Sequence, residues 1–471
     1  MLHNSRGATP AARPALPLPA SFPASFTWGA ATSAYQIEGA VGADGRGRSV
    51  WDDFCRLPGK VADGQNGDGA CDHYHRWAED VALMRDLGLN AYRFSVAWPR
   101  VMPAGTGSVN AAGLAFYDRL VDGLLAAGIE PWVTLFHWDY PSELYRRGGW
   151  LHPESPRWFA DYARVVVERL SDRVSHWMTL NEAQCFVYLG HQRGEHGPGD
   201  QLELRDVLRV AHHSLLAHGL GAQVIRAHAK KPSRIGWAPT GDVAVPATTS
   251  AADVAAAREA YWSVAGDHVW NQAWWMDPVL RGHYPEQGLR AYGGAVPAFT
   301  AEEMRTIHQP LDFFGLNTYN GYVVRAGADG RPERIAREPG AATTHMQWHI
   351  TPAALYWGPR WVHERYRLPV VITENGMAGH DWVHLDGRVP DPARIDYLSR
   401  YLAELRRAIA DGVPVEGYFH WSLLDNFEWA EGYRRRFGLI HVDYTTQQRT
   451  LKDSARWYAE VIRQNGANIC G

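Results

Sequence analysis

A repeated alternation of short apolar stretches with longer amphipathic ones is the feature that most constrains the fold of this chain. The short stretches are rich in Val, Ile, Leu and Phe, which predicts strands buried on both faces, as in a parallel sheet. We expect such strands at residues 26–32, 89–96, 129–136, 176–181, 234–238, 312–319, 370–374 and 415–423. Helical spacing of apolar residues predicts helices at 73–87, 110–128, 155–170, 205–229, 393–410 and 453–463.

Strand and helix patterns that alternate along a whole chain favour a closed α/β barrel, the (β/α)8 TIM barrel, over an open sheet. The 471 residues exceed a minimal barrel of roughly 250. The extra length lies in connections that would deepen a pocket, around residues 40–70, 183–204, 241–300, 320–350 and 376–390. Since no linker divides the chain, we predict one domain over residues 21–471, preceded by a disordered Ala/Pro-rich tail at 1–20.

Composition excludes several classes of function. A net charge of -4 gives no electrostatic footprint for nucleic acid or an acidic membrane surface. No apolar run approaches the ~20 residues of a membrane span, and residues 1–20 lack the apolar segment of a secretory signal. Four scattered cysteines have no metal-ligand spacing, so we expect reduced thiols, a cytoplasmic location, and no metal or cofactor. The oligomeric state stays open.

Two glutamates stand at the ends of predicted strands. Glu182 follows the strand at 176–181, and Glu374 ends the strand at 370–374. The carboxyl ends of barrel strands hold the chemistry of this fold, and a pair of carboxyl groups is the minimum for cleaving a glycosidic bond. Other polar and indole side chains at strand ends would converge on the same mouth, as a sugar site requires: Gln36, Glu38, Arg93, His137, Trp138, Asn181, Asn317, Tyr319, Trp421, Glu428 and Trp429. The 21 tryptophans also suit stacking on sugar rings.

Five motifs in this order resemble glycoside hydrolase family 1, the β-glucosidase family, over residues 22–465. They are Phe-Thr-Trp-Gly-Ala-Ala-Thr-Ser-Ala-Tyr-Gln-Ile-Glu-Gly (26–39), Thr-Leu-Asn-Glu (179–182), Ile-Thr-Glu-Asn-Gly (372–376), Trp-Ser-Leu-Leu-Asp-Asn-Phe-Glu-Trp (421–429) and Gly-Tyr-Arg-Arg-Arg-Phe-Gly-Leu (432–439). The resemblance implies retaining hydrolysis, with Glu374 as nucleophile and Glu182 as acid/base. Arg93, Asn317 and Tyr319 complete the catalytic group that the resemblance implies.

The physics of the pair agrees with these roles. A positive charge from Arg93 and a hydroxyl donor from Tyr319 would favour the ionised form of Glu374. The charge on Glu374 would raise the pKa of Glu182, which must begin protonated to serve the leaving oxygen. Once the sugar esterifies Glu374, that pKa falls and Glu182 becomes the base that activates water.

The resemblance also implies a sugar-binding set: Gln36, His137, Trp138, Asn181, Trp348, Trp421, Glu428, Trp429 and Phe437. Asn181 matches the residue that reaches the 2-hydroxyl, and Trp348 the aromatic that lines the aglycone side. Glu428 stands where the 6-phospho-glycosidase branch has a serine, so its carboxylate predicts an unphosphorylated sugar, and Phe437 agrees. Ala183 and Thr318 depart from the family pattern without removing a catalytic group. Gln347 and His349, which flank Trp348, also depart from it, and this puts aglycone preference in doubt.

The leading hypothesis is an exo-acting β-glucosidase that acts on cellobiose, short oligosaccharides or aryl and alkyl glucosides. A β-galactosidase or β-fucosidase activity stands as the alternative within the enzyme class, since these sugars differ at single hydroxyl groups. A sugar-binding protein without catalysis would lack one carboxylate, whereas this chain has both.

Ordinary structural roles remain alternatives for single residues. His137 alone would be a hydrogen-bonded structural histidine, Trp138 wall packing, and Arg93 a buried ion-pair partner. The arginine run at 434–436 predicts a solvated loop, and Trp262, Trp270, Trp274 and Trp275 predict core packing. Two histidine pairs could suggest metal binding, but His73 and His75 start a helix without cysteine or acidic companions, and His212 and His213 are adjacent on a helix and point apart.

Overall fold

A closed barrel of eight parallel strands forms the centre of the computed structural model, which describes residues 21–469. Its strands neighbour one another in the order β1-β11-β10-β7-β5-β4-β3-β2. They are β1 (Thr27–Ala31), β2 (Ala91–Ser95), β3 (Glu130–Phe136), β4 (His176–Asn181), β5 (Arg234–Ala238), β7 (Phe313–Asn317), β10 (Val370–Asn375) and β11 (Val415–Trp421). The predicted (β/α)8 barrel is confirmed. The tail predicted at 1–20 and Cys470 lie outside the described residues.

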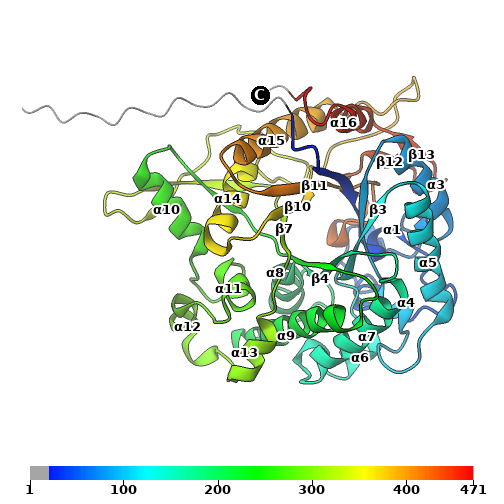
Figure 1. The fold of residues 1–471 in the computed structure, drawn as a ribbon, viewed down its shortest axis with the longest axis horizontal. Coiled ribbons are helices and arrows are strands. Elements are labelled where there is room, and N and C mark those ends of the chain that lie inside the picture. Colours follow the sequence, from blue (N-terminus) through cyan, green and yellow to red (C-terminus); the bar gives the residue numbers. More distant parts are fainter. Residues whose placement is uncertain (1–20, 470–471) are drawn as a thin grey trace, which may run out of the picture.

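Helices surround the barrel, as Figure 1 shows, and four of them (α10 to α13) gather on one side of the molecule. The helices are α1 (Ala34–Ile37), α2 (Val50–Phe54), α3 (His73–Asp86), α4 (Trp98–Val101), α5 (Ala111–Ala126), α6 (Ser142–Arg146), α7 (Ser155–Leu170), α8 (Ala183–Val187), α9 (Leu204–His228), α10 (Ala251–Trp262), α11 (Ala273–Arg281), α12 (Glu286–Tyr292), α13 (Ala301–Ile307), α14 (Ala354–Tyr366), α15 (Pro392–Ala410) and α16 (Asp453–Arg463). Within the described chain, none of these helices is long and apolar enough to cross a membrane.

Local sequence explains where the outer helices begin and end. Helix α7 has Pro156 in its first turn, where the missing N–H of proline costs nothing, and buries Trp158, Tyr162 and Val166 on one face. Helix α5 ends before Gly128, whose φ of +75° is a left-handed conformation that glycine adopts without strain. Each helix therefore turns back toward the next strand at a defined point.

Large side chains fill the inside of the barrel below its mouth. The indole of Trp132 stacks on His176, with ring centroids 4.0 Å apart, and contacts Phe313 and Phe419. Gly236 leaves room for one of these rings, because a Cβ there would stand 2.2 Å from Phe313. The barrel is thus a packed core, and any cavity at its carboxyl end is closed underneath.

Two small sheets outside the barrel were not predicted. Strand β6 (Val243–Pro246) pairs with β8 (Gly321–Ala326), which pairs with β9 (Pro332–Arg334), and β12 (Ile440–Val442) pairs with β13 (Arg449–Leu451). All five are short, and β6 and β9 each contain a proline, so no alternating pattern of sufficient length signals them. The sheet β6-β8-β9 lies within the long connections after β5 and β7.

Candidate active site

Both predicted catalytic carboxyl groups lie at irregular points of barrel strands. Glu374 is in β10, where the pairing with β7 shifts register between Ile372 and Glu374. Glu182 follows β4 directly and has a φ of +45°, which is unusual for a residue with a side chain. Such bulges and strained conformations re-aim side chains and cluster at functional sites.

Glu374 is held from two sides. Arg93 donates from Nη1 to Oε1 at 2.5 Å, and Tyr319 donates its hydroxyl to Oε2 at 2.6 Å. Arg93 is fully buried, and Glu374 is 3% exposed. Both carboxylate oxygens therefore have a strong donor, one of them positively charged, which favours the ionised state.

Glu182 receives a weaker contact. Asn317 donates from Nδ2 to Glu182 Oε1 at 2.8 Å and to Asn181 Oδ1 at 2.9 Å. Thr373 fixes the orientation of this amide, because its hydroxyl donates to Asn317 Oδ1 at 2.6 Å. Arg93 also donates to Asn181 Oδ1, at 2.6 Å, so one continuous network of side chains links the two carboxyl groups.

The surroundings of the pair separate their proton affinities. Burial raises the pKa of Glu182 to about 8, and the negative charge of Glu374 adds to that rise. Burial raises the pKa of Glu374 as well, but the Arg93 guanidinium and the Tyr319 hydroxyl oppose it. Since the hydrogen-bond donors to Glu182 are an amide and a thiol, whereas Arg93 bonds directly to Glu374, the single negative charge of the pair resides on Glu374.

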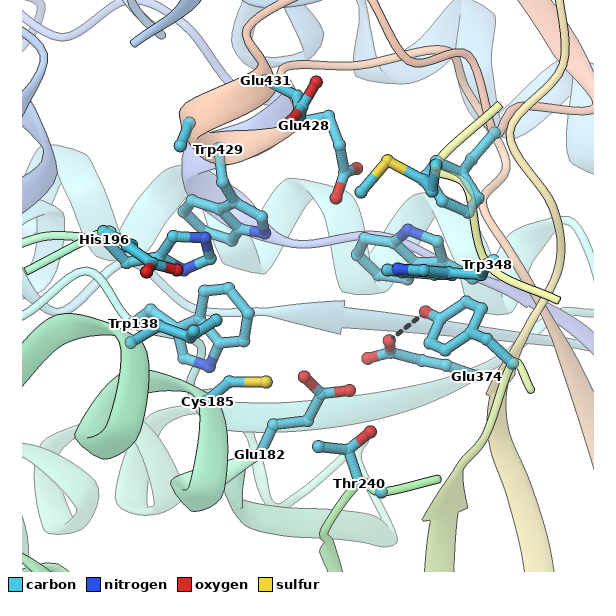
Figure 2. Close-up of a pocket in the computed structure, with 18 of the residues that line it drawn as sticks. Trp138, Glu182, Cys185, His196, Thr240, Trp348, Glu374, Glu428, Trp429 and Glu431 are labelled. Atoms are coloured by element: carbon cyan, nitrogen blue, oxygen red, sulfur yellow. Dashed lines mark hydrogen bonds between the residues drawn. The ribbon is translucent and has the colours of Figure 1, made fainter. Parts of the chain in front are cut away.

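A cavity of about 530 Å³ opens at the carboxyl ends of the strands and contains both carboxyl groups. Figure 2 shows Glu182 and Glu374 pointing into it, with Trp138 and Trp429 on one side and Trp348 on the other. Ten of the predicted site residues line the cavity: His137, Trp138, Glu182, Tyr319, Trp348, Glu374, Trp421, Glu428, Trp429 and Phe437.

The other five predicted residues do not line the cavity, and one of them, Glu38, is buried and pairs with Arg100 at 2.7 Å. Arg93, Asn181 and Asn317 are fully buried and orient the carboxyl groups, as described above. Gln36 donates from Nε2 to Phe427 O at 2.9 Å and to Glu428 Oε2 at 3.3 Å. The structure thus places Gln36 beneath Glu428 rather than on the cavity surface.

His137 lines the cavity and has one ring nitrogen without a hydrogen-bond partner among the described residues. The Oδ1 of Asn181 accepts from Arg93 and Asn317, so its Nδ2 donates to His137 Nε2 at 3.0 Å. Burial, with the charge of Arg93, holds the pKa of His137 well below its ordinary value, so the ring is neutral and Nδ1 carries its proton. That buried Nδ1 has no partner among the described residues, which suits recognition of a hydroxyl group.

Indoles surround this donor. His137 stacks against Trp421 and Trp429, with ring centroids 5.7 and 6.0 Å apart. Trp138 and Trp429 have φ values of +79° and +51°, which place bulky residues in an uncommon backbone conformation. Their strain at the cavity wall indicates that the indoles are positioned for a ligand rather than for packing alone.

Twelve residues that line the cavity were not predicted from the sequence. These additional lining residues are Cys185, Leu189, Glu195, His196, Thr240, Gly241, Asp242, Trp270, Asn320, Met346, Ala430 and Glu431. Trp270 corrects a prediction, because it lines the cavity and is only half-buried, whereas Trp274 and Trp275 are core residues as expected. For all of these residues except Thr240, Ala430 and Glu431, the available signal was their position in loops predicted to deepen the pocket.

Two further features of the sequence, the histidine pair at 73 and 75 and the arginine run at 434–436, take part in structural contacts. His73 bonds to Asp80 at 2.7 Å, and no cluster of metal-ligating side chains occurs within residues 21–469. The prediction of a solvated loop for the arginine run is wrong for Arg436, which is 20% exposed and pairs with the fully buried Asp425 at 2.7 Å. Buried carboxylates need such partners, so that arginine is part of the core charge network.

Comparison with known proteins gives a consistent result. The model of the family described as glycosyl hydrolase family 1 matches residues 18–467. A β-glucosidase A of Thermotoga maritima is 44% identical over 94% of this chain and 98% of its own length. A β-glucosidase A of Acetivibrio thermocellus is 43% identical over 95% of this chain and 99% of its own. The solved structure of the T. maritima β-glucosidase in complex with glucoimidazole superposes with a TM-score of 0.87, covering 95% of this chain and 100% of that one.

Proposed function

The chain belongs to glycosyl hydrolase family 1, and from this premise we propose that it is a β-glucosidase that removes terminal β-D-glucosyl residues with retention of configuration. The observation that carries the proposal is that two carboxyl groups in one cavity have different hydrogen-bond donors and different proton affinities. Glu374 has a guanidinium and a phenol as donors, whereas Glu182 has an amide and a raised pKa. Double displacement needs this pair of states, an ionised nucleophile beside a protonated acid.

The proposed reaction has two steps. In the first, a carboxylate oxygen of Glu374 attacks the anomeric carbon while Glu182 gives its proton to the departing glycosidic oxygen, leaving a glycosyl ester and a free alcohol. Loss of the charge on Glu374 then lowers the pKa of Glu182. In the second step Glu182 takes a proton from water, the water oxygen attacks the anomeric carbon, and Glu374 leaves as a carboxylate.

The shape of the cavity supports an exo mode of attack. Its floor is the packed interior of the barrel, where Trp132, Phe313 and Phe419 meet. A saccharide chain cannot continue through that floor, so the sugar beside Glu374 is the last one. We therefore expect release of single sugar units from the non-reducing end of cellobiose, short oligosaccharides, and aryl or alkyl glucosides.

The choice of sugar follows from the residues above the carboxyl pair. The described lining residues include Glu428 but no Lys or Arg, so the cavity offers no cationic side chain to bind the phosphate of a phosphorylated sugar. The relatives at 43–44% identity are named as β-glucosidases, which favours glucose. One structure of the T. maritima enzyme is a complex with galacto-hydroximolactam, so we also expect β-galactosidase or β-fucosidase side activity here.

A cytoplasmic location is part of the proposal. The described cysteines, Cys55, Cys71 and Cys185, are free and buried, and burial raises the pKa of each thiol. Buried thiols of this kind are typical of proteins in a reducing compartment.

A panel of nitrophenyl glycosides, combined with NMR of the first-formed product, tests the proposal. We expect release from the β-glucoside, weaker release from the β-galactoside and β-fucoside, and none from the β-glucoside 6-phosphate. The first product should be β-glucose. An α-anomer would exclude retention, and no release from any glycoside would favour a sugar-binding protein without catalysis.

A further inference from the structure

The cavity wall is acidic throughout. Six carboxyl groups line it, and none of the described lining residues is Lys or Arg: Glu182, Glu195, Asp242, Glu374, Glu428 and Glu431. The histidines there add no positive charge at neutral pH, because burial lowers the pKa of His137 and of His196, the latter to about 4. Any charge preference of the cavity therefore depends on which of these carboxylates lacks compensation.

Five of the six carboxyl groups are compensated. Arg93 balances the charge of Glu374, and burial raises the pKa of Glu182 and Glu428 to about 8, so these two carry protons at neutral pH. The two outer glutamates have arginine partners: Glu195 with Arg193 at 3.0 Å, and Glu431 with Arg435 at 2.7 Å.

Asp242 is the exception. Within residues 21–469 no basic nitrogen lies within 4.0 Å of its carboxylate. Burial raises the pKa of Asp242 above its ordinary value, whereas the charge of Arg334, from beyond ion-pair distance, and a hydrogen bond from the side chain of Asn320 favour the carboxylate. A carboxylate that is neither paired nor fully solvated favours a cationic ligand more than an exposed one does.

The position of Asp242 places it on the leaving-group side of the cavity. The backbone N–H of Glu182 donates to Ala238 O at 2.8 Å, so the acid/base stands level with the end of β5. Asp242 lies four residues further along the same loop and lines the cavity. The leaving group occupies that region, because Glu182 protonates the departing oxygen.

We propose that Asp242 makes the leaving-group side of the cavity selective for β-glucosides whose aglycone carries an ammonium group. The carboxylate accepts hydrogen bonds from the ammonium, and the indoles of Trp270 and Trp348, which also line the cavity, attract a cation. An aglycone that carries a carboxylate is repelled by the same group. This inference rests on the proposed glucosidase activity and adds a chemical class of substrate to it.

Three phenyl β-D-glucosides test the proposal, with aminomethyl, hydroxymethyl or carboxymethyl groups at the para position. These substituents vary the charge of the aglycone while the leaving groups remain phenols of similar acidity. We expect kcat/KM for the ammonium substrate to exceed that for the neutral one by about tenfold, and the carboxylate substrate to be the poorest. In Asp242→Asn the ratio of ammonium to neutral substrate should fall close to one.

Glu195→Gln is the matched control, because its carboxylate also lines the cavity but already has an arginine partner. We expect this variant to keep the preference. Rising salt should reduce the preference in the unaltered enzyme, which tests the electrostatic origin even if Asp242→Asn fails to fold. A ratio near one in the unaltered enzyme, or an equal loss in Glu195→Gln, would overturn the assignment. Failure to hydrolyse even the neutral glucoside would instead contradict the proposed function.

Discussion

Removing the hydroxyl of Tyr319 tests how the nucleophile is kept ionised. That hydroxyl donates to Glu374 Oε2 at 2.6 Å inside a buried site, and the remaining oxygen keeps Arg93. A hydrogen bond to a charged group contributes about 1.5–3 kcal/mol, which corresponds to roughly one to two pH units. The bond stabilises the carboxylate, so its loss in Tyr319→Phe raises the pKa of Glu374.

The assay is the pH dependence of kcat/KM for nitrophenyl β-glucoside, whose acid limb reports ionisation of the nucleophile in the free enzyme. Activity requires the carboxylate and is lost as pH falls through that pKa. We therefore expect the acid limb of Tyr319→Phe to move to higher pH by about one to two units. Tyr397→Phe is the matched control, because Tyr397 donates to the backbone oxygen of Tyr319 at 2.8 Å and does not touch Glu374. An unshifted acid limb in Tyr319→Phe would refute the reasoning.

Two further predictions concern the acid/base and the support of the barrel mouth. Because Glu182 must be protonated and its pKa is raised to about 8, activity should decline as pH rises through that region. The variant Glu182→Gln should lose this alkaline limb of the pH profile and most activity toward alkyl glucosides. An alkaline limb that persists unchanged would assign it to another group. Lys452 is fully buried and bonds to Asp381 at 2.5 Å and to Asp425 at 2.7 Å. Lys452→Met should therefore lower the free energy of unfolding by about 3–5 kcal/mol and lower Tm. Lys230→Met is the control, because Lys230 is exposed and its loss should leave Tm unchanged.

The barrel was predictable because its elements have strong local signals. Helix α7 begins at Ser155 and ends at Leu170 as expected, since a proline marks its start and its apolar residues keep helical spacing throughout. Strand β10 reads as a continuous apolar run because both of its faces are buried. The sheet β6-β8-β9 has neither signal, since β6 pairs with the distant strand β8 (Val243 opposite Gly321) and β9 is only three residues long.

The site was predictable in its members but not in their orientation. Sequence motifs bring Gln36 and Glu428 to the same place, yet only the structure shows that the amide lies behind the carboxyl group. Trp270 was assigned to the core because an indole on a cavity wall and one in a core have the same spacing. Asp242 belongs to no motif, and its lack of an ion-pair partner among residues 21–469 depends on where neighbouring loops place their arginines.

The account depends most on the identity of the nucleophile. A 2-deoxy-2-fluoro-β-glucosyl fluoride reacts through the first step but slows the second, so the glycosyl ester accumulates and can be located by mass spectrometry of peptides. We predict one equivalent of glycosyl adduct on the peptide that contains Glu374, with loss of activity in proportion. An adduct on any other residue, or hydrolysis through a path that never forms an ester, would contradict the central claim.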